Sequence, residues 1–321
     1  MYRNWGFNLQ TVYFGGGTPS LLPPEMIGEI LEGIRNTVKS MPVEVTVEVN
    51  PETYRYQQFK RLRESGINRI SIGVQTFQDR MLKMLGREHS VKDSLQAIEE
   101  AFDAGIGNIS VDLIYGIQGQ TVREIERDLK ILEKLPVKHV SAYMLTAYEG
   151  TPLGQLVKEK RYFLPDEETV NEMFLIIDSF LEERGFLRYE ISNWAKTNYQ
   201  CKHNLFYWER EEFLGIGVSA WSFVKSKRFG NIKNLSIYLK RIKENKKPVE
   251  FVEFIDADEE KKEKIFLGLR LRKGIELNLV KGKEEFLKRL ENEGLVEIRN
   301  GRVCLTPKGV LVSNYISAEL I

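Results

Sequence analysis

The sequence predicts an α/β protein with a parallel sheet curled toward a barrel, followed by a small C-terminal domain. Helical patterns separate the strand-like runs by roughly 25–40 residues, as in βαβ units. Near the C-terminus, helical patterns precede a hairpin with an Asn-Gly turn at 300–301. Alternating strands and helices favour a parallel sheet. The strand-like runs in the first half are Thr11–Phe14, 43–49, 69–74, 108–114 and 139–145.

Four helices have recognisable starts, three in the first half of the chain and one just after it. Pro23 and Pro24 precede apolar residues at a helical period, through Ile27, Leu31 and Val38. Ser90 with Asp93 and Thr121 with Glu124 have the spacing of capping boxes. Asp166 opens a further helix that is expected to end near Gly185.

Composition narrows the class of protein. Hydrophobic residues make up 42% and charged residues 29% of the 321 residues, and the formal net charge is +1. A chain of this balance is an ordinary globular protein with no global attraction to nucleic acid or membranes. No apolar run approaches the ~20 residues of a membrane span, and no secretory signal opens the sequence. Cys201 and Cys304, the two cysteines, lie far apart, so we expect a cytoplasmic protein.

Polar residues are expected to gather at the carboxyl end of the sheet. Three glycines, 15–17, follow the first strand, and glycine lets a ligand approach the main chain closely. Glu48, Gln75, Asp112 and Thr146 stand in or directly after the later strands. One such residue would usually be a structural hydrogen-bonding group. Several at the same end of successive strands indicate the mouth of a ligand-binding barrel.

Taken together, several motifs resemble the radical S-adenosylmethionine (SAM) enzymes of the oxygen-independent coproporphyrinogen III oxidase family. The motifs match in order and spacing over almost the whole chain. The block Cys-Lys-His-Asn-Leu-Phe-Tyr-Trp at 201–208 resembles the heme chaperone branch of that family, as do its flanks at 189–195 and 215–217. The family motifs are Gly-Gly-Gly-Thr-Pro-Ser (15–20), Val-Glu-Val-Asn-Pro (47–51), Arg-Ile-Ser-Ile-Gly-Val-Gln-Thr-Phe (69–77), Leu-Gly-Arg (85–87) and Val-Asp-Leu-Ile-Tyr-Gly (111–116).

The resemblance implies a SAM site. Carboxylates suit the ammonium and ribose diol of SAM, and a guanidinium suits its carboxylate. Taken singly, Arg87 could form a surface salt bridge, and Glu48 and Asp112 could cap strand ends. The positions that match SAM-contacting residues of the family are Gly16, Gly17, Thr18, Glu48, Gln75, Arg87, Asp112 and Thr146.

The chain departs from the family at the iron–sulfur cluster. Family members hold a [4Fe–4S] cluster with Cys-x-x-x-Cys-x-x-Cys after the first barrel strand, and two distant cysteines do not supply it. Thr11–Phe14 corresponds to the second strand of the family, and Met1–Gly6 resembles the end of the preceding helix. The expected fold is therefore a partial radical SAM (β/α) barrel without its first unit, with no ligand for the cluster in this chain. Its five parallel strands should leave Thr11–Phe14 at one edge of the sheet and 139–145 at the other. We expect an N-terminally truncated chain or a late start codon, with a natural cluster-free paralogue as the alternative.

The resemblance also implies a heme site in the 201–208 block. His203 is the candidate axial ligand and Cys201 a second one, with Asn204, Tyr207 and Trp208 in the same signature. From residue chemistry alone, a core histidine in a second aromatic core explains this block better than an iron ligand does; the resemblance makes the two interpretations about equal.

We expect three parts: a partial radical SAM barrel (1–165), a covering helix with the heme-chaperone-type region (166–250), and a winged-helix-like domain (251–321). No nucleic acid partner is expected, because acidic residues offset basic ones on the would-be recognition helix. Its acids are Glu284, Glu285, Glu291 and Glu293, against Lys283, Lys288 and Arg289.

The resemblance implies a heme chaperone. The complete protein would bind SAM, a [4Fe–4S] cluster and heme, and would pass heme to a hemoprotein. One alternative is the oxygen-independent coproporphyrinogen III oxidase. The other is a cluster-free, catalytically silent paralogue. Without Cys-x-x-x-Cys-x-x-Cys, the chain as given is expected to be inactive as a radical enzyme.

Overall fold

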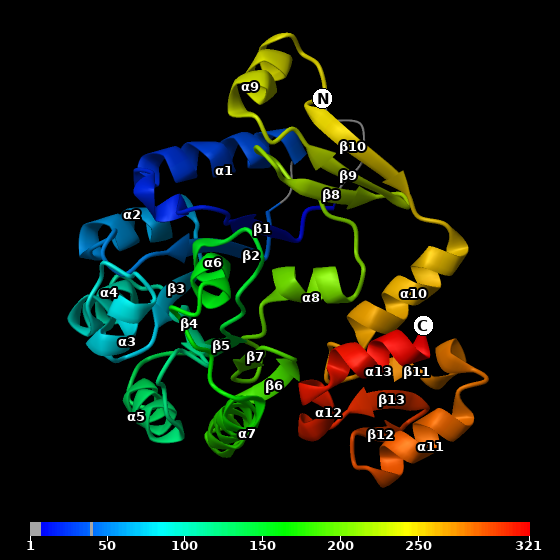
Figure 1. Ribbon diagram of the computed structural model, residues 1–321. Coiled ribbons are helices and arrows are strands. Elements are labelled where there is room, and N and C mark those ends of the chain that lie inside the picture. Colours follow the sequence, from blue (N-terminus) through cyan, green and yellow to red (C-terminus); the bar gives the residue numbers. More distant parts are fainter. Residues whose placement is uncertain (1–7, 39–40) are drawn as a thin grey trace. The chain divides into compact units, whose positions relative to one another are not determined.

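The computed structural model describes residues 8–38 and 41–321 (Figure 1). Contacts between residues divide the described chain into two compact units, Asn8–Cys201 and Lys202–Ile321. The segment Met1–Gly6, expected to end a preceding helix, lies outside the described residues. The finer boundaries expected near residues 165 and 250 stay a prediction.

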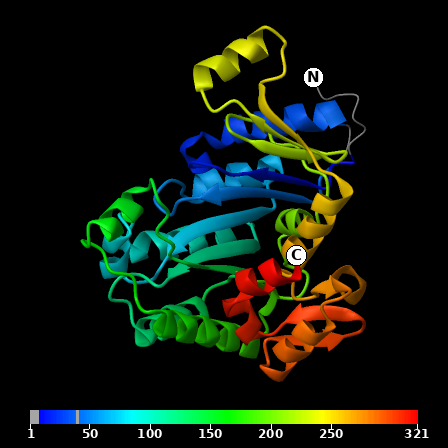
Figure 2. The same cartoon turned by 45° about the vertical axis from the view of Figure 1, so that its right-hand side comes forward.

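The first unit contains a seven-stranded sheet in the order β1-β2-β3-β4-β5-β7-β6. Its first five strands are parallel neighbours and run side by side from blue to green in Figures 1 and 2. These five are the strands expected from the sequence: β1 (Thr11–Phe14), β2 (Glu44–Val49), β3 (Arg69–Gln75), β4 (Asn108–Tyr115) and β5 (His139–Met144).

Of the two expected edges of this sheet, one is confirmed and the other is wrong. Within the described residues β1 pairs with β2 alone, so its expected edge position is confirmed. The expectation that 139–145 forms the other edge was wrong, because β7 (Asn193–Ala195) pairs antiparallel to β5 and β6 (Leu187–Glu190) follows it. Strands of four and three residues are too short to show a periodic pattern, and their connection carries no glycine.

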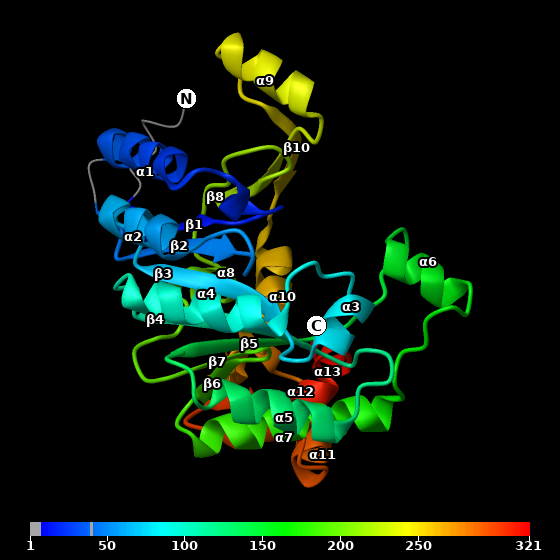
Figure 3. The same ribbon diagram turned by 90° about the vertical axis from the view of Figure 1, so that its left-hand side faces the viewer.

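Helices connect the strands and cover one face of the sheet, as Figure 3 shows for α1, α2, α4 and α5. The expected capping boxes are present at Ser90 and Thr121, and Asp166 caps α7. The helices of this unit are α1 (Pro24–Val38), α2 (Tyr56–Ser65), α3 (Asp79–Met84), α4 (Val91–Asp103), α5 (Val122–Leu132), α6 (Pro152–Lys158) and α7 (Glu167–Glu183), with a 3-10 turn, η2, at Pro19–Leu21.

The sheet has two chemically distinct faces. Successive strand residues point to opposite sides, and here apolar and polar residues alternate. The buried apolar set includes Val45, Val47, Ile70, Ile72, Ile109, Val111 and Val140. The opposite face carries a polar set that is also buried: Glu44, Thr46, Arg69, Ser71, Ser110, His139 and Ser141. One face therefore forms the hydrophobic core with the helices, and the other lines a polar interior.

The second unit contains two small sheets. The first has β8 (Trp221–Val224), β9 (Lys227–Asn231) and β10 (Val249–Phe254), with α8 (Lys202–Trp208) before it and α9 (Leu235–Lys243) between β9 and β10. The second has the order β11-β13-β12, from Ile275–Glu276, Arg302–Leu305 and Val296–Arg299. The remaining elements are α10 (Ala257–Gly268), η3 (Leu277–Val280), α11 (Glu284–Asn292), α12 (Pro307–Leu311) and α13 (Ser313–Leu320).

The C-terminal hairpin confirms the expected turn. Asn300 and Gly301 have φ values of 52° and 72°, the left-handed pair that a two-residue hairpin turn requires. Together with α10 and α11 it gives the helix–helix–hairpin order expected from the sequence. In the part of the chain that the structure describes, no helix combines the length and the apolar character needed to span a bilayer.

Candidate functional site

A pocket of about 260 Å³ opens at the carboxyl ends of the parallel strands of the first unit. Its walls come from the glycine loop after β1 and from the ends of β2, β3, β4 and β5. Ligands of parallel α/β folds bind at this end of the strands. The lining residues are Gly17, Thr18, Pro19, Glu48, Val49, Asn50, Ser71, Gly73, Gln75, Arg87, Asp112 and Tyr143.

The glycine loop needs its glycines for two separate reasons. Gly16 and Gly17 have φ values of 78° and 68°, which place both in the left-handed region that side-chain-bearing residues rarely adopt. Gly15 needs space instead: a Cβ there would lie 2.8 Å from the Tyr13 ring and 3.2 Å from the Glu48 carboxyl carbon. The loop can therefore bring main-chain polar groups directly to a ligand.

Two carboxylates face the pocket and are held by hydroxyl groups. The Tyr13 hydroxyl donates a 2.8 Å hydrogen bond to Glu48 Oε1. Ser71 Oγ lies 3.1 Å from both carboxylate oxygens of Asp112. Burial raises the pKa of Asp112 to about 6, although hydrogen bonds from Ser141 and Ser71 and the charge of Arg69 act in the opposite direction. Burial, reinforced by Glu48 and Asp112, also raises the pKa of Tyr13.

Gln75 and Arg87 complete the polar lining. Gln75 has a left-handed φ of 67°, and its side chain folds back over Gly73, where a Cβ would lie 2.8 Å from Gln75 Nε2. Arg87 lines the pocket, and no carboxylate of the described residues lies within ion-pair distance of it. The simpler interpretation of Arg87 as a surface salt bridge therefore finds no support, and its guanidinium is available to an anionic ligand.

The structure thus brings six of the eight predicted positions to one pocket: Gly17, Thr18, Glu48, Gln75, Arg87 and Asp112. Gly16 belongs to the same loop but does not line the pocket. Thr146 also lies outside the lining; it is exposed, and its hydroxyl donates to the Met144 carbonyl at 3.3 Å.

Sequence reasoning missed Asn50, Ser71 and Tyr143 as lining residues. Ser71 and Tyr143 share the polar face of their strands with Gln75 and Ser141. The alternation of apolar and polar residues along β3 and β5 would have identified them, but the predicted site was drawn from polar residues near the ends of the strands.

The second candidate region is α8, in the other unit. His203 and Tyr207 lie one helical turn apart, and the two side chains pair. His203 Nε2 lies 2.9 Å from the Tyr207 hydroxyl, with the rings edge-to-face at 5.0 Å between centroids. Tyr207 packs in turn against Phe213 at 4.6 Å. His203 is partly exposed and Tyr207 is exposed, so this imidazole is no buried core histidine.

The other members of the predicted heme set are placed differently. Cys201 belongs to the first unit, where its thiol is fully buried and lies 3.5 Å from Glu44 Oε1. Asn204 is partly exposed on α8. Trp208 stacks against Arg270, whose guanidinium carbon lies 4.5 Å from the ring centroid. Its Nε1 is buried and, within the described residues, has no hydrogen-bond partner.

Comparison with known proteins agrees with this geometry. A profile of the radical SAM superfamily matches residues 2–132, and one of the HemN C-terminal domain matches 255–312. Heme chaperone HemW of Bacillus subtilis is 34% identical over 320 residues, which cover 96% of this chain and 84% of that protein. Heme chaperone HemW of Mycobacterium tuberculosis is 32% identical over 315 residues, 98% of this chain and 81% of that protein. The chain belongs to the HemW family.

The fold of this HemW family member is also that of a solved structure. Coproporphyrinogen III oxidase (HemN) of Escherichia coli superposes with a TM-score of 0.79 over 97% of this chain and 77% of that one, at 19% identity. The expected radical SAM type of α/β fold is therefore confirmed, and the small domain expected at the C-terminus is of the HemN type.

Radical SAM proteins use SAM and a [4Fe–4S] cluster, and the HemW-type chain fits these two groups unequally. The pocket offers carboxylates, a guanidinium and open main chain, the donor set that SAM requires. The cluster does not fit: the sequence has two cysteines, each buried in a different unit. In the described residues no group of three or more His, Cys, Asp or Glu could hold a metal. These 321 residues do not supply a three-thiolate site.

Proposed function

We propose that this chain binds SAM in the pocket of its first unit and heme through α8, and that it acts as a heme chaperone. Bound SAM would bring a sulfonium and an amino acid group. Glu48 and Asp112 are suited to its ammonium or ribose hydroxyls, Arg87 to its carboxylate, and the 15–17 loop to its polar ends. We propose Thr146 and Gly16 as outer contacts only.

The heme proposal depends chiefly on one observation, the partly exposed His203 on α8. An imidazole nitrogen is a common axial ligand of heme iron, and the aromatic side chains of Tyr207 and Trp208 suit the face of a macrocycle. Ligation through Nε2 requires that nitrogen to leave the Tyr207 hydroxyl, 2.9 Å away. Cys201 is the weaker candidate, because ligation would have to extract a fully buried thiol from beside Glu44.

The test is a titration with heme and with iron-free protoporphyrin IX, followed by absorbance. If His203 ligates the iron, His203→Ala should weaken heme binding at least about tenfold and shift the Soret band, while protoporphyrin binding should change little. His89→Gln is the matched control, since it removes another of the three histidines from the other unit. Equal heme affinity and an unchanged spectrum in His203→Ala would exclude His203 as the ligand.

The chaperone step is tested separately. Protein loaded with heme is mixed with an apo-hemoprotein, and the transfer is followed by the appearance of the acceptor's Soret band. Loss of transfer in His203→Ala at equal heme loading would support delivery from this residue. Coproporphyrinogen III oxidase activity is supported by the shared fold alone, and we do not favour it.

A further inference from the structure

His89 is a buried histidine that the proposed SAM contacts do not use. It follows α3, two residues after Arg87, and its side chain is 1% exposed. Both ring nitrogens face oxygen atoms. Nε2 lies 3.2 Å from the Val74 carbonyl, and Nδ1 lies 3.5 Å from Glu52 Oε2. Because carbonyl and carboxylate oxygens only accept, the ring serves both when both nitrogens carry a proton.

The first contact supports the strained turn at Gln75. The Val74 carbonyl also accepts a 2.8 Å hydrogen bond from the amide of Thr76, two residues later. With φ of 67° at Gln75, these residues form a three-residue turn of the rare, strained kind. The second hydrogen bond from His89 fixes the carbonyl that closes this turn. The turn in turn directs the Gln75 side chain back over Gly73 into the pocket.

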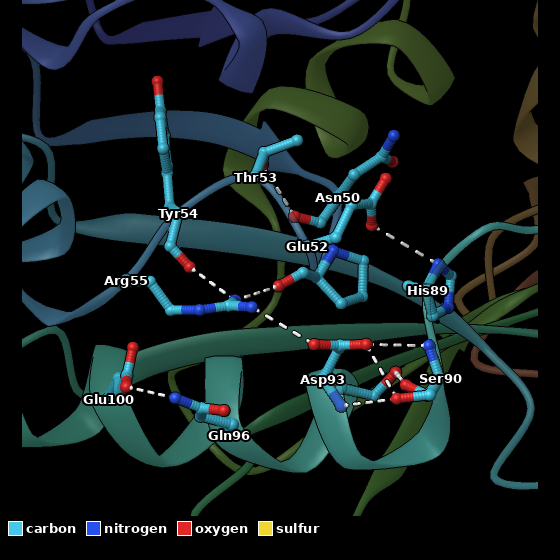
Figure 4. Close-up of polar contacts among 12 residues, drawn as sticks. Asn50, Glu52, Thr53, Tyr54, Arg55, His89, Ser90, Asp93, Gln96 and Glu100 are labelled. Carbon is cyan, nitrogen blue, oxygen red and sulfur yellow. Dashed lines mark hydrogen bonds and ion pairs between the residues drawn. The ribbon is translucent and has the colours of Figure 1, made fainter.

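The second contact joins two loops that supply pocket residues. Glu52 belongs to the loop after β2, which carries Asn50, and His89 belongs to the loop that carries Arg87. Figure 4 shows this link beside a second one: Arg55 binds the Pro51 carbonyl at 2.9 Å and Asp93 at 3.1 Å. The first bridge joins the two loops, and the second joins the end of the β2–α2 loop to α4, which directly follows the loop of Arg87.

We propose that His89 is a positioning residue that fixes the Gln75 turn and the Arg87 loop against Glu52, and so preorganises the pocket for its ligand. This inference rests on the proposed SAM site. Among the charged groups, Glu52 on the β2–α2 loop contacts the ring, and the Arg55–Asp93 pair lies beside this link (Figure 4). A preorganised site binds more tightly because fewer groups must be ordered on binding.

The experiment measures SAM affinity by calorimetry for the full chain and for His89→Gln, which keeps the volume but serves one acceptor only. We expect a loss of affinity of about three- to tenfold, of the order of one ordinary hydrogen bond. Glu52→Gln should give a smaller loss in the same direction, and the two changes together should not add. Glu88→Gln, an exposed neighbour on the same loop, is the control and should bind as the native chain does.

A second readout needs no ligand. With ¹⁵N-labelled histidine the chain gives signals from three residues, His89, His139 and His203. Because Nδ1 faces Glu52 and Nε2 faces the Val74 carbonyl, Glu52→Gln should shift the His89 ¹⁵N signals and leave those of His139 and His203 unchanged. His89 signals that are insensitive to Glu52→Gln would overturn the proposal whatever the affinity for SAM.

The two proposals fail in different ways. If Arg87→Ala leaves SAM affinity unchanged, the SAM site itself is wrong. If Arg87→Ala weakens binding and folded His89→Gln does not, the site stands and the positioning role of His89 is refuted. Thermal unfolding of each variant identifies any loss of affinity that merely follows from loss of fold.

Discussion

The Tyr13 hydroxyl on β1 donates a 2.8 Å hydrogen bond to the Glu48 carboxylate on β2. The two residues are neither adjacent in sequence nor opposite each other in register, since Tyr13 pairs with Thr46. The bond reaches along the strand, from the polar face of the edge strand to the wall of the pocket. An edge strand that pairs with β2 alone thereby also orients a carboxylate of the proposed site.

Tyr13→Phe should therefore lower both the stability of the fold and the affinity for SAM. Loss of the phenol removes one hydrogen bond to a charged acceptor, about 1.5 kcal/mol of the free energy of unfolding. SAM affinity should fall severalfold, because Glu48 loses the group that orients it. Tyr162→Phe is a suitable control for stability, since the Tyr162 hydroxyl accepts a hydrogen bond from the Gln118 amide and does not line the pocket. Denaturant unfolding and calorimetry measure the two effects.

Asp112 should make SAM binding depend on pH. Its pKa is raised to about 6 by burial, so in the free protein the neutral form is favoured at low pH. The stability that goes with the raised pKa is present at acid pH and is lost as pH rises through about 6. A cationic ligand needs the ionised form, so affinity should increase between about pH 5 and pH 7. Asp112→Asn should bind about tenfold more weakly at pH 7 and show no such increase. A native pH profile that is flat, or one that Asp112→Asn retains, would contradict this assignment.

Gly73→Ala should weaken SAM binding and have little effect on the stability of the fold. The added Cβ would lie 2.8 Å from Gln75 Nε2, so the amide must move, but a flexible side-chain end moves cheaply. We expect a several-fold loss of SAM affinity with a change in unfolding free energy below about 1 kcal/mol. Gly33→Ala on α1 provides the contrast: no atom lies near its Cβ position, so helix propensity should stabilise the protein by about 0.5–1 kcal/mol. Unaltered SAM binding in Gly73→Ala would show that Gln75 is not a contact.

Asp178→Ala tests what holds the last two strands of the large sheet. Asp178 on α7 accepts from Arg188 Nε at 3.0 Å and from Trp194 Nε1 at 2.7 Å, and all three side chains are buried. Removing the carboxylate leaves two buried donors without the acceptor they share. The free energy of unfolding should fall by about 3 kcal/mol. Asp166→Ala, which removes only the exposed cap of the same helix, should cost clearly less; an equal cost for the two would argue against the buried network.

Tyr207→Phe tests the pairing on α8. If Nε2 of His203 is the iron ligand, removing the hydroxyl that competes for it should strengthen heme binding severalfold, opposite to His203→Ala. The Soret titration measures both. A loss of heme affinity in Tyr207→Phe would instead assign the hydroxyl itself to the site.

The local features that the sequence could predict are those that depend on neighbours along the chain. Capping at Ser90, Thr121 and Asp166 is satisfied within three residues, and the Asn300–Gly301 turn needs only its own φ angles. The strand ends that carry Glu48, Gln75 and Asp112 were also predictable, because parallel strands bring their carboxyl ends together.

What escaped prediction depends on distant partners. The pairing of β5 with β7 joins residues more than 50 positions apart through three residue pairs. The Tyr13–Glu48 bond and the His89 contacts with Val74 and Glu52 arise only when separate loops meet. His89 gave no signal in the sequence, because a lone histidine has no spacing pattern that would reveal two oxygen partners.

The alternation of the sheet has a consequence for folding. Side chains change face at every residue, so a strand that paired one position out of register would exchange its two faces. For β3 such a slip would drive Arg69 and Gln75 into the layer between sheet and helices, and turn Ile70 and Ile72 toward the polar interior. A buried charge without a partner, such as Arg69 after the slip, costs several kcal/mol, so a one-residue slip is penalised on both faces at once. The polar residues that line the binding site thus also help to specify the register of the strands. Substitutions that make this polar face apolar should slow folding and increase the fraction of chains with misaligned strands.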